Sequence, residues 1–230
     1  MIDIHSHLLY NVDDGSKNID ESVKIIKNLK SQGITDIILT PHYINYSEYT
    51  STKKENQEKL KELQKQIKDV NLYLGNEIYI DEEISNLIKN NEISPLNDTK
   101  YLLIELPMSG ENDKYRDIFL DLMNEGYKVI LAHPERYITF QKDFSKVEEM
   151  INIGVLLQCN IGSILKQYGR KAKKTFIKIL KSGYVSYIGT DIHHEIDYNI
   201  IKKAQAKMQK YVDEKTIEDI FINNAKKMLR

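Results

Sequence analysis

A short apolar run, a polar turn and a longer amphipathic stretch recur along the chain, and this alternation limits the folds open to it more than any other feature. The apolar runs are rich in Ile, Leu, Val or Tyr and lack strict polar alternation, which is typical of strands buried on both faces. They cover Ile2–Ile4, Ile34–Leu39, Asn71–Leu74, Tyr101–Ile104, Lys128–Ala132, Val155–Gln158 and Val185–Ile188. Seven strands that alternate with helices predict parallel pairing in an α/β fold.

Helical periodicity fills the segments between these runs. Ile19–Ser31 has one apolar face, and Gly33 follows it as a C-cap. Gly126, Gly154 and Gly183 each stand between an amphipathic stretch and the next apolar run, which indicates helix-to-strand turns. The other expected helices are Thr52–Lys68, Lys114–Glu125, Lys146–Asn152, Lys171–Ser182 and Tyr198–Tyr211.

Imidazoles and carboxylates stand at the carboxyl ends of six of the seven predicted strands. These residues are His5, His7, His42, Glu77, Glu105, His133, Asp191 and His193. In a barrel such ends converge on one mouth, whereas in an open doubly wound sheet they spread along a line. The positions therefore favour a closed or nearly closed barrel, formed as one domain by residues 1–230.

Imidazole and carboxylate ligands together suit zinc, manganese, iron or cobalt. The spacing of His5 and His7 lets both side chains point the same way and reach one ion, and Asp191 and His193 share it. These eight candidate ligands are more than one ion can coordinate. Two or three divalent ions are therefore expected, with Glu77 as the bridging carboxylate. Such clusters lower the pKa of a bound water to about 7 and favour phosphoester hydrolysis.

Further polar residues complete the predicted site. Arg136 lies three residues after His133, where a guanidinium could hold phosphate oxygens in a bidentate fork. Asp14 in the first loop could ligate a metal, handle a proton or cap the loop. His194 is interpreted as a neighbour of the ligands that contacts substrate or solvent. Glu105 could pair with Arg136 instead of a metal, and Arg136 could be a plain salt-bridge partner.

Composition and missing motifs exclude several other functions. The net charge of −1, from 33 basic and 34 acidic residues, argues against a general nucleic-acid-binding protein. The one cysteine, Cys159, forms no intramolecular disulfide, and no signal peptide or membrane span is evident, so a cytoplasmic setting is expected. A cysteine-dependent phosphatase needs an arginine where Leu165 stands. No Walker A, Gly-x-Gly or Gly-x-Ser-x-Gly sequence occurs.

The ordered motifs resemble the polymerase and histidinol phosphatase (PHP) superfamily. The motifs are Asp3-Ile-His-Ser-His7, Thr40-Pro-His42, Ala132-His-Pro-Glu-Arg136 and Thr190-Asp-Ile-His193. One branch is more similar still, the bacterial tyrosine-protein phosphatases encoded with capsule and exopolysaccharide genes. The similarity to this branch rests on Met1-Ile-Asp-Ile-His-Ser-His7, Asp13-Asp-Gly15, Glu21-Ser22, Gly75-Asn-Glu77 and Leu103-Ile-Glu105.

The resemblance implies a distorted TIM-like (β/α)7 barrel of the PHP type, with a metal cluster that is usually manganese. It implies a phosphatase acting on phosphotyrosines of a partner tyrosine kinase that controls polysaccharide export, which would recruit the protein to the membrane. Arg136, Asp14 and His193 would be catalytic, and Arg136 would bind phosphate. The implied ligands are His5, His7, His42, Glu77, Glu105, His133, Asp191 and His193.

One segment departs from that branch, which usually carries another arginine several residues after its Asp-x-His. Residues 194–203 contain none, so His194 or Lys202 would have to replace any phosphate contact of that arginine. Two alternatives stay open: a small-molecule phosphatase, such as one acting on histidinol phosphate, and a metal-stabilised kinase-binding protein without catalysis. The chain has little spare length for a lid, which favours an open site for a protein substrate.

Overall fold

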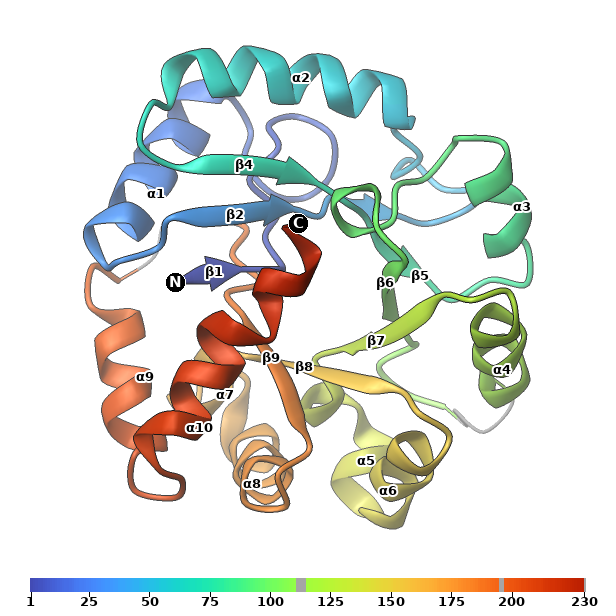
Figure 1. The fold of residues 1–230 in the computed structure, drawn as a ribbon, viewed down its shortest axis with the longest axis vertical. Helices are drawn as coiled ribbons and strands as arrows, with labels where there is room; N and C mark the ends of the chain where they lie inside the picture. The colour runs from blue at the N-terminus through green and yellow to red at the C-terminus, as the bar shows by residue number, and fades with distance from the viewer. Residues whose placement is uncertain (111–114, 195–196, 230) are drawn as a thin grey trace.

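The computed structural model describes residues 1–110, 115–194 and 197–229, in which short parallel strands surround the middle of the molecule (Figure 1). One sheet has the order β1 (Ile2–Asp3), β2 (Asp36–Leu39), β4 (Asn71–Leu74). The other has the order β3 (His42–Tyr43), β5 (Glu77–Tyr79), β6 (Tyr101–Glu105), β7 (Lys128–Ala132), β8 (Leu156–Asn160), β9 (Val185–Gly189). Each of the seven predicted apolar runs overlaps a strand, so the predicted parallel α/β fold is confirmed.

Two strands, β3 and β5, are additional to the prediction. They follow β2 and β4 after two-residue breaks, at positions 40–41 and 75–76. Pro41 has no N–H for a strand ladder, while its carbonyl oxygen accepts from Glu77 N at 3.2 Å and from Asn76 Nδ2 at 3.1 Å. Beyond the breaks, His42 and Glu77 become register partners. The interruption therefore sets two predicted ligands side by side.

The two sheets also meet between the first and last strands. Ser6 and Ile192 form an isolated parallel bridge. Asp191 N donates to His5 O at 2.8 Å, and His7 N donates to Ile192 O at 2.9 Å. The expected closed ladder of seven strands is therefore confirmed only in part, because two sheets and a bridge replace one continuous sheet. The backbone of Asp191, at φ 50°, has left the extended conformation that a longer ladder needs.

Helices lie outside the strands (Figure 1). They are α1 (Ile19–Ser31), α2 (Lys53–Gln66), α3 (Ile84–Lys89), α4 (Arg116–Asn124), α5 (Ile138–Lys142), α6 (Ser145–Asn152), α7 (Ile161–Ile164), α8 (Gly169–Lys181), α9 (Ile200–Met208) and α10 (Glu214–Glu218). All six predicted helices are present, although Lys114 of the predicted Lys114–Glu125 lies outside the described residues. Thr52 caps α2 in a capping box with Glu55. No helix of the described chain is both long and apolar enough to cross a bilayer.

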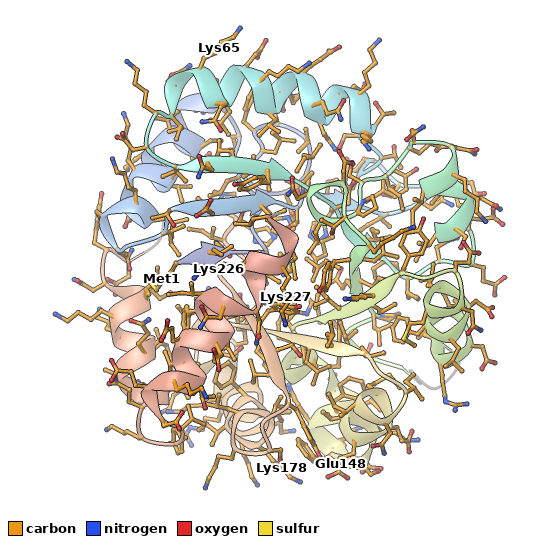
Figure 2. The ribbon with its side chains drawn as sticks, in the orientation of Figure 1. Met1, Lys65, Glu148, Lys178, Lys226 and Lys227 are labelled. Carbon is orange, nitrogen blue, oxygen red and sulfur yellow. The ribbon has the colours of Figure 1, made fainter. Side chains whose placement is uncertain are left out.

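A buried apolar cluster, here called the floor, fills the interior between the strands, and C-terminal residues cover it at the amino ends of the strands (Figure 1). Its C-terminal members, Ala225 and Met228, are at most 1% exposed, whereas Lys226 and Lys227 between them face solvent (Figure 2). Asn97, just before β6, donates through Nδ2 to Met228 O at 2.7 Å. The floor thus closes the end opposite the predicted ligands. It comprises Ile2, Ile4, Ile38, Leu96, Tyr101, Leu103, Ile130, Ala132, Tyr187, Ala225 and Met228.

Candidate metal centre

The carboxyl ends of the strands bring the predicted ligands together at one mouth. Seven of the eight belong to overlapping groups whose ligand atoms lie within 4.8 Å of one another. The eighth, His133, places Nε2 2.8 Å from Glu77 Oε1. The groups are a buried one (His5, His7, Glu77, Asp191), an outer one (His7, Asp14, His42, His193) and a bridging one (His42, Glu77, Glu105).

The buried group points two imidazoles at each other. His5 Nε2 and His7 Nε2 are 3.2 Å apart. Glu77 Oε2 lies 3.2 Å from His5 Nε2 and 3.1 Å from His7 Nε2. Asp191 Oδ1 lies 3.4 Å and 3.3 Å from the same two nitrogens. Four candidate donor atoms therefore surround one point, which is the arrangement that a metal ion requires.

Hydrogen bonds on the far side of each ring fix which nitrogen carries the proton. His5 Nδ1 lies 2.8 Å from Gln158 Oε1, and His7 Nδ1 lies 2.8 Å from Asp13 Oδ2. Both oxygens accept, so each Nδ1 donates, and in the neutral ring Nε2 keeps a bare lone pair. Gln158 Nε2 donates to Asn160 Oδ1 at 2.9 Å, which sets the orientation of the amide. Each Nε2 is therefore the nitrogen that faces the other ring, and a divalent cation between them would displace any proton held there and bind both nitrogens, so this donor set fits a metal ion.

Buried polar atoms without partners support the same fit. Among the described residues, Glu77 Oε2, His42 Nδ1 and His133 Nδ1 are buried and make no hydrogen bond. His42 Nδ1 lies 3.1 Å from Glu77 Oε2 without hydrogen-bond geometry. An unpaired buried carboxylate oxygen is costly, because burial removes its water without replacing it. A metal ion would satisfy this oxygen and the histidine nitrogen together.

The centre also carries an excess of buried carboxylates. Burial, together with the Glu77 carboxylate, raises the pKa of Glu105 to about 8. Burial disfavours a charged His5, but the carboxylates of Glu77 and Asp191 outweigh it and raise the pKa of His5 to about 9. The residues alone therefore hold protons that a divalent cation would displace on binding.

The outer group is open to solvent. The side chain of Asp14 is 50% exposed and that of His193 is 27% exposed. Asp14 Oδ1 lies 3.5 Å from His193 Nε2 and 3.6 Å from His42 Nε2, so Asp14 faces the centre. The loop cap is instead Asp13, whose Oδ1 accepts from Gly15 N at 2.9 Å. Burial and the neighbouring His7 lower the pKa of His193 to about 4, which keeps this ring neutral and able to ligate.

Asp191 and His193 lie in different groups, although their spacing predicted one shared ion. The left-handed backbone of Asp191, at φ 50°, turns the chain between them, so the period-two rule for strands does not apply. His133 also has a left-handed backbone, at φ 33°. Non-glycine residues in this region cost about 1–3 kcal/mol each and concentrate at functional sites.

Arg136 borders the centre and is held from two sides. Its Nη1 donates to Asp191 Oδ2 at 2.8 Å, so its ion-pair partner is Asp191 rather than Glu105. Its guanidinium carbon lies 4.6 Å from the ring centroid of Tyr168, a cation–π arrangement. Asn160 Nδ2 donates to the same Asp191 oxygen at 2.6 Å. The Arg136 side chain stays one-quarter exposed, so a ligand can reach it.

His194 lies outside the three groups. It is 54% exposed, and its Nδ1 is 3.6 Å from Glu21 Oε1. Residues 195–196 of the arginine-free segment lie outside the described residues.

Sequence reasoning missed the residues that support the ligands. β8, the strand without a ligand, contributes Gln158 and Asn160, whose period-two polar spacing at a strand end resembles His-x-His and could have revealed them. Two glycines make room for the histidines. A Cβ on Gly15 would lie 2.1 Å from His7 O, and one on Gly189 would lie 2.7 Å from His5 Cβ. Neither position admits a side chain without moving a ligand.

Comparisons with known proteins identify the family of this chain. A family model described as capsular polysaccharide synthesis, CpsB/CapC, matches residues 1–230. The putative tyrosine-protein phosphatase CapC of Staphylococcus aureus is 38% identical over 84% of this chain and 77% of its own length. The tyrosine-protein phosphatase YwqE of Bacillus subtilis (strain 168) is 30% identical over 84% of this chain and 78% of its own length.

Solved structures show the same fold. A chain from the crystal structures of YwqE from Bacillus subtilis and CpsB from Streptococcus pneumoniae, described as unique metal-dependent tyrosine phosphatases, has a TM-score of 0.92 and 28% identity, covering 100% of this chain and 94% of its own. Histidinol phosphate phosphatase from Lactococcus lactis has a TM-score of 0.60 at 17% identity, covering 91% and 93%, and shares the fold alone. The resemblance inferred from the motifs is confirmed, and the chain belongs to the CpsB/CapC family of capsular polysaccharide synthesis proteins.

Proposed function

We propose that this protein is a metal-dependent protein-tyrosine phosphatase that dephosphorylates a tyrosine kinase controlling capsular or exopolysaccharide synthesis. The observation that carries the proposal is the buried pair of Nε2 atoms on His5 and His7, 3.2 Å apart, with Glu77 and Asp191 around them and Arg136 on the rim. Relatives at 38% and 30% identity are named putative tyrosine-protein phosphatase and tyrosine-protein phosphatase, which supports the substrate class. We further infer that the protein works in the cytoplasm and reaches the membrane through that kinase.

The residues present suit two or three divalent ions held in one distorted TIM-like barrel formed by residues 1–230. Manganese is the first candidate from the family resemblance, and iron, cobalt and zinc accept the same ligand types. Bound ions would lower the pKa of a bound water to about 7 and stabilise charge on phosphoryl oxygens. The residues that would hold them are His5, His7, His42, Glu77, Glu105, His133, Asp191 and His193, with Asp14 at the outer group.

Arg136, on the rim of the centre, is placed to bind the phosphate. Asp191 and Tyr168 hold its guanidinium in one orientation. The arginine side chain therefore loses less conformational entropy when it binds phosphate oxygens. Asp14, beside His193 and half-exposed, is positioned to move a proton between water and the leaving oxygen. Tyrosine leaves as a phenol of pKa about 10, so this assistance need only be modest.

An open mouth favours a phosphoprotein over a small metabolite. Asp14, His193 and Arg136 are all partly exposed. The long segment between β3 and β4 is largely occupied by α2, which lies on the outside of the strands rather than over their ends (Figure 1). A protein chain could therefore approach the centre without a lid having to open.

Turnover of three substrates tests the proposal against its alternatives. A phosphotyrosine peptide, histidinol phosphate and a generic aryl phosphate would be assayed with and without added manganese, with bound metal measured in the same samples. We expect manganese-dependent hydrolysis of the peptide and the aryl phosphate. Preference for histidinol phosphate by orders of magnitude would contradict a tyrosine phosphatase. If the metal-loaded protein turned over none of the three substrates, the protein would be a non-catalytic binding protein and not an enzyme.

A further inference from the structure

We propose that the groove between α5 and α8 binds an acidic segment that flanks the phosphotyrosine of a protein substrate. This inference rests on the proposed function and adds a docking surface to it. The groove has a volume of about 580 Å³. Its lining is Ile138, Phe140, Gln141, Lys142, Phe144, Lys171, Lys174, Thr175 and Lys178, with four lysines and no carboxylate.

The groove begins where the phosphate would be held. α5 starts two residues after Arg136, and Gln141 in the groove wall donates through Nε2 to Arg136 O at 3.2 Å. On the other wall, Tyr168 lies under the Arg136 guanidinium and directly precedes α8. Both walls are therefore anchored to the same arginine. A peptide whose phosphate lies on Arg136 would have its neighbouring residues at the head of the groove.

Most of the positive charge of the groove has no counter-charge in contact with it. The nearest acidic group is Asp143, between the lining residues Lys142 and Phe144, whose pKa is lowered by hydrogen bonds from Ser145 and, to a smaller extent, by Lys146 and Lys178. Lys171, Lys174 and Lys178 recur at intervals of three and four residues, which places them on one face of α8. In the described part of the chain, Lys142, Lys171 and Lys174 have no carboxylate within 4.0 Å, and Lys178 lies over the ring of Phe144, 3.8 Å from its centroid. The protein as a whole has a net charge of −1, so this basic surface is a local feature.

Some lysines elsewhere pair with carboxylates of distant segments. Lys53 has its Nζ 2.6 Å from Asp98 Oδ1, and Lys89 has its Nζ 3.3 Å from Glu125 Oε2. Both partners come from another part of the chain. Among the described residues most lysines lack such a partner, but the four groove lysines are distinct in being gathered on one concave surface beside Arg136. Their natural complement is therefore negative charge from another molecule.

An apolar side chain at the head of the groove favours a polypeptide as the occupant. Ile138 is 44% exposed and is one of four large apolar or aromatic side chains that the described protein leaves open. From Lys171 to Lys178, α8 rises about 10 Å, at roughly 1.5 Å per residue. An extended peptide covers that length with about three residues. Acidic residues within a few positions of the phosphotyrosine would therefore meet the lysines.

Peptide kinetics of a charge-reversal variant test the groove. Lys171→Glu/Lys174→Glu would be compared with the unaltered protein on a phosphotyrosine peptide with acidic flanks, on its neutral counterpart and on a small aryl phosphate. We expect KM for the acidic peptide to rise on the order of tenfold, since two exposed attractive pairs become repulsive. The kcat values and the aryl phosphate constants should stay unchanged. High salt should remove the preference of the unaltered protein for the acidic peptide.

The matched control reverses two lysines on α2, far from α8. Lys61→Glu/Lys65→Glu changes the net charge equally, and Lys65 lies at the opposite edge of the molecule from Lys178 (Figure 2). If KM for the acidic peptide rose equally in this control, the effect would come from the net charge of the protein, and the proposal that the groove binds the peptide would be wrong. Equal KM for acidic and neutral peptides on the unaltered protein would overturn it too, while continued peptide turnover would leave the proposed function standing.

A vesicle-binding experiment tests whether the groove binds a membrane surface and not a peptide. Vesicles of anionic lipid would be tested with the same two double variants. We expect no binding that depends on Lys171 and Lys174. Loss of vesicle binding in the α8 variant, with unchanged peptide KM, would show that the groove contacts a membrane and would contradict the proposal.

Discussion

The floor and the mouth of this protein lie at opposite ends of the same strands and obey opposite rules. Met228 and the other floor residues are apolar, buried and packed. At the mouth, buried nitrogens and carboxylate oxygens lack partners, and Asp191 and His133 have left-handed backbones. The floor therefore stabilises the fold, whereas the mouth accepts unfavourable contacts that a metal ion would relieve. Changes at the floor should cost stability, and changes at the mouth should cost activity.

The largest effect should come from His133→Ala at the mouth. We expect kcat/KM to fall on the order of 10³-fold or more, about 4 kcal/mol, because a side chain at the centre is lost. The free energy of unfolding of the metal-free protein should change less than the activation free energy does, because the substitution removes the unpaired Nδ1 together with the hydrogen bond between Nε2 and Glu77. Steady-state kinetics and urea unfolding would measure the two quantities. Full activity of this variant would show that the centre is wrongly assigned.

Removing metal should turn the mouth from a stabilising into a destabilising region. With metal at about a thousand times its Kd, binding contributes about 4 kcal/mol, so a chelator should lower the melting temperature by roughly 10 °C. Manganese added back should restore the melting temperature and turnover together. The chelator shift should shrink in His133→Ala. An unchanged melting curve on chelation would mean that the mouth holds no ion.

Met228→Ala should have the converse effect at the floor. Truncating this buried side chain should lower the free energy of unfolding by about 2–4 kcal/mol, because it leaves a cavity. The kcat of the folded fraction should be unchanged. Lys227→Ala, on the exposed side of the same turn, serves as the control and should alter neither value. If Met228→Ala lost activity while its free energy of unfolding stayed unchanged, the floor would not serve stability alone, and the contrast with the mouth would be wrong.

Gln158→Leu should have the smallest effect of these changes. It separates the candidate ligands at the mouth from the residues that only orient them. It removes the acceptor of His5 Nδ1 and frees the ring to take the wrong tautomer. Loss of such a supporting contact usually weakens metal affinity about tenfold to a hundredfold, or roughly 1.4–2.8 kcal/mol. Metal titration with a competing chelator would measure it. Gln66→Leu on α2 is the surface control, and equal affinities in both variants would assign Gln158 to packing alone.

The sequence predicted the strands well, and the candidate ligands that follow them lie together at the mouth, because both are encoded locally. An apolar run predicts a buried strand, and the residue that follows it reaches the mouth, as with His133 after β7. The amphipathic pattern even gave the bounds of α1, Ile19–Ser31. Short helices such as α5 and α7 were missed, because five or four residues are too few to reveal a helical period.

What the sequence could not show depends on contacts between distant residues. The break at Pro41 is set by donors on Asn76 and Glu77, more than 30 residues away. The choice of Asp191 over Glu105 as the partner of Arg136 likewise depends on how β6 and β9 are placed. Residue type alone cannot distinguish such partners.

Gly15 and Gly189 carry no chemistry, yet they limit which related sequences can be active. Both lie so close to His7 and His5 that even a methyl group would collide with backbone or Cβ atoms of those histidines. A homologous chain could therefore retain every ligand and still be a pseudoenzyme if alanine stood at either position. When genomes are searched for working members of this family, these two empty positions should be checked alongside the histidines.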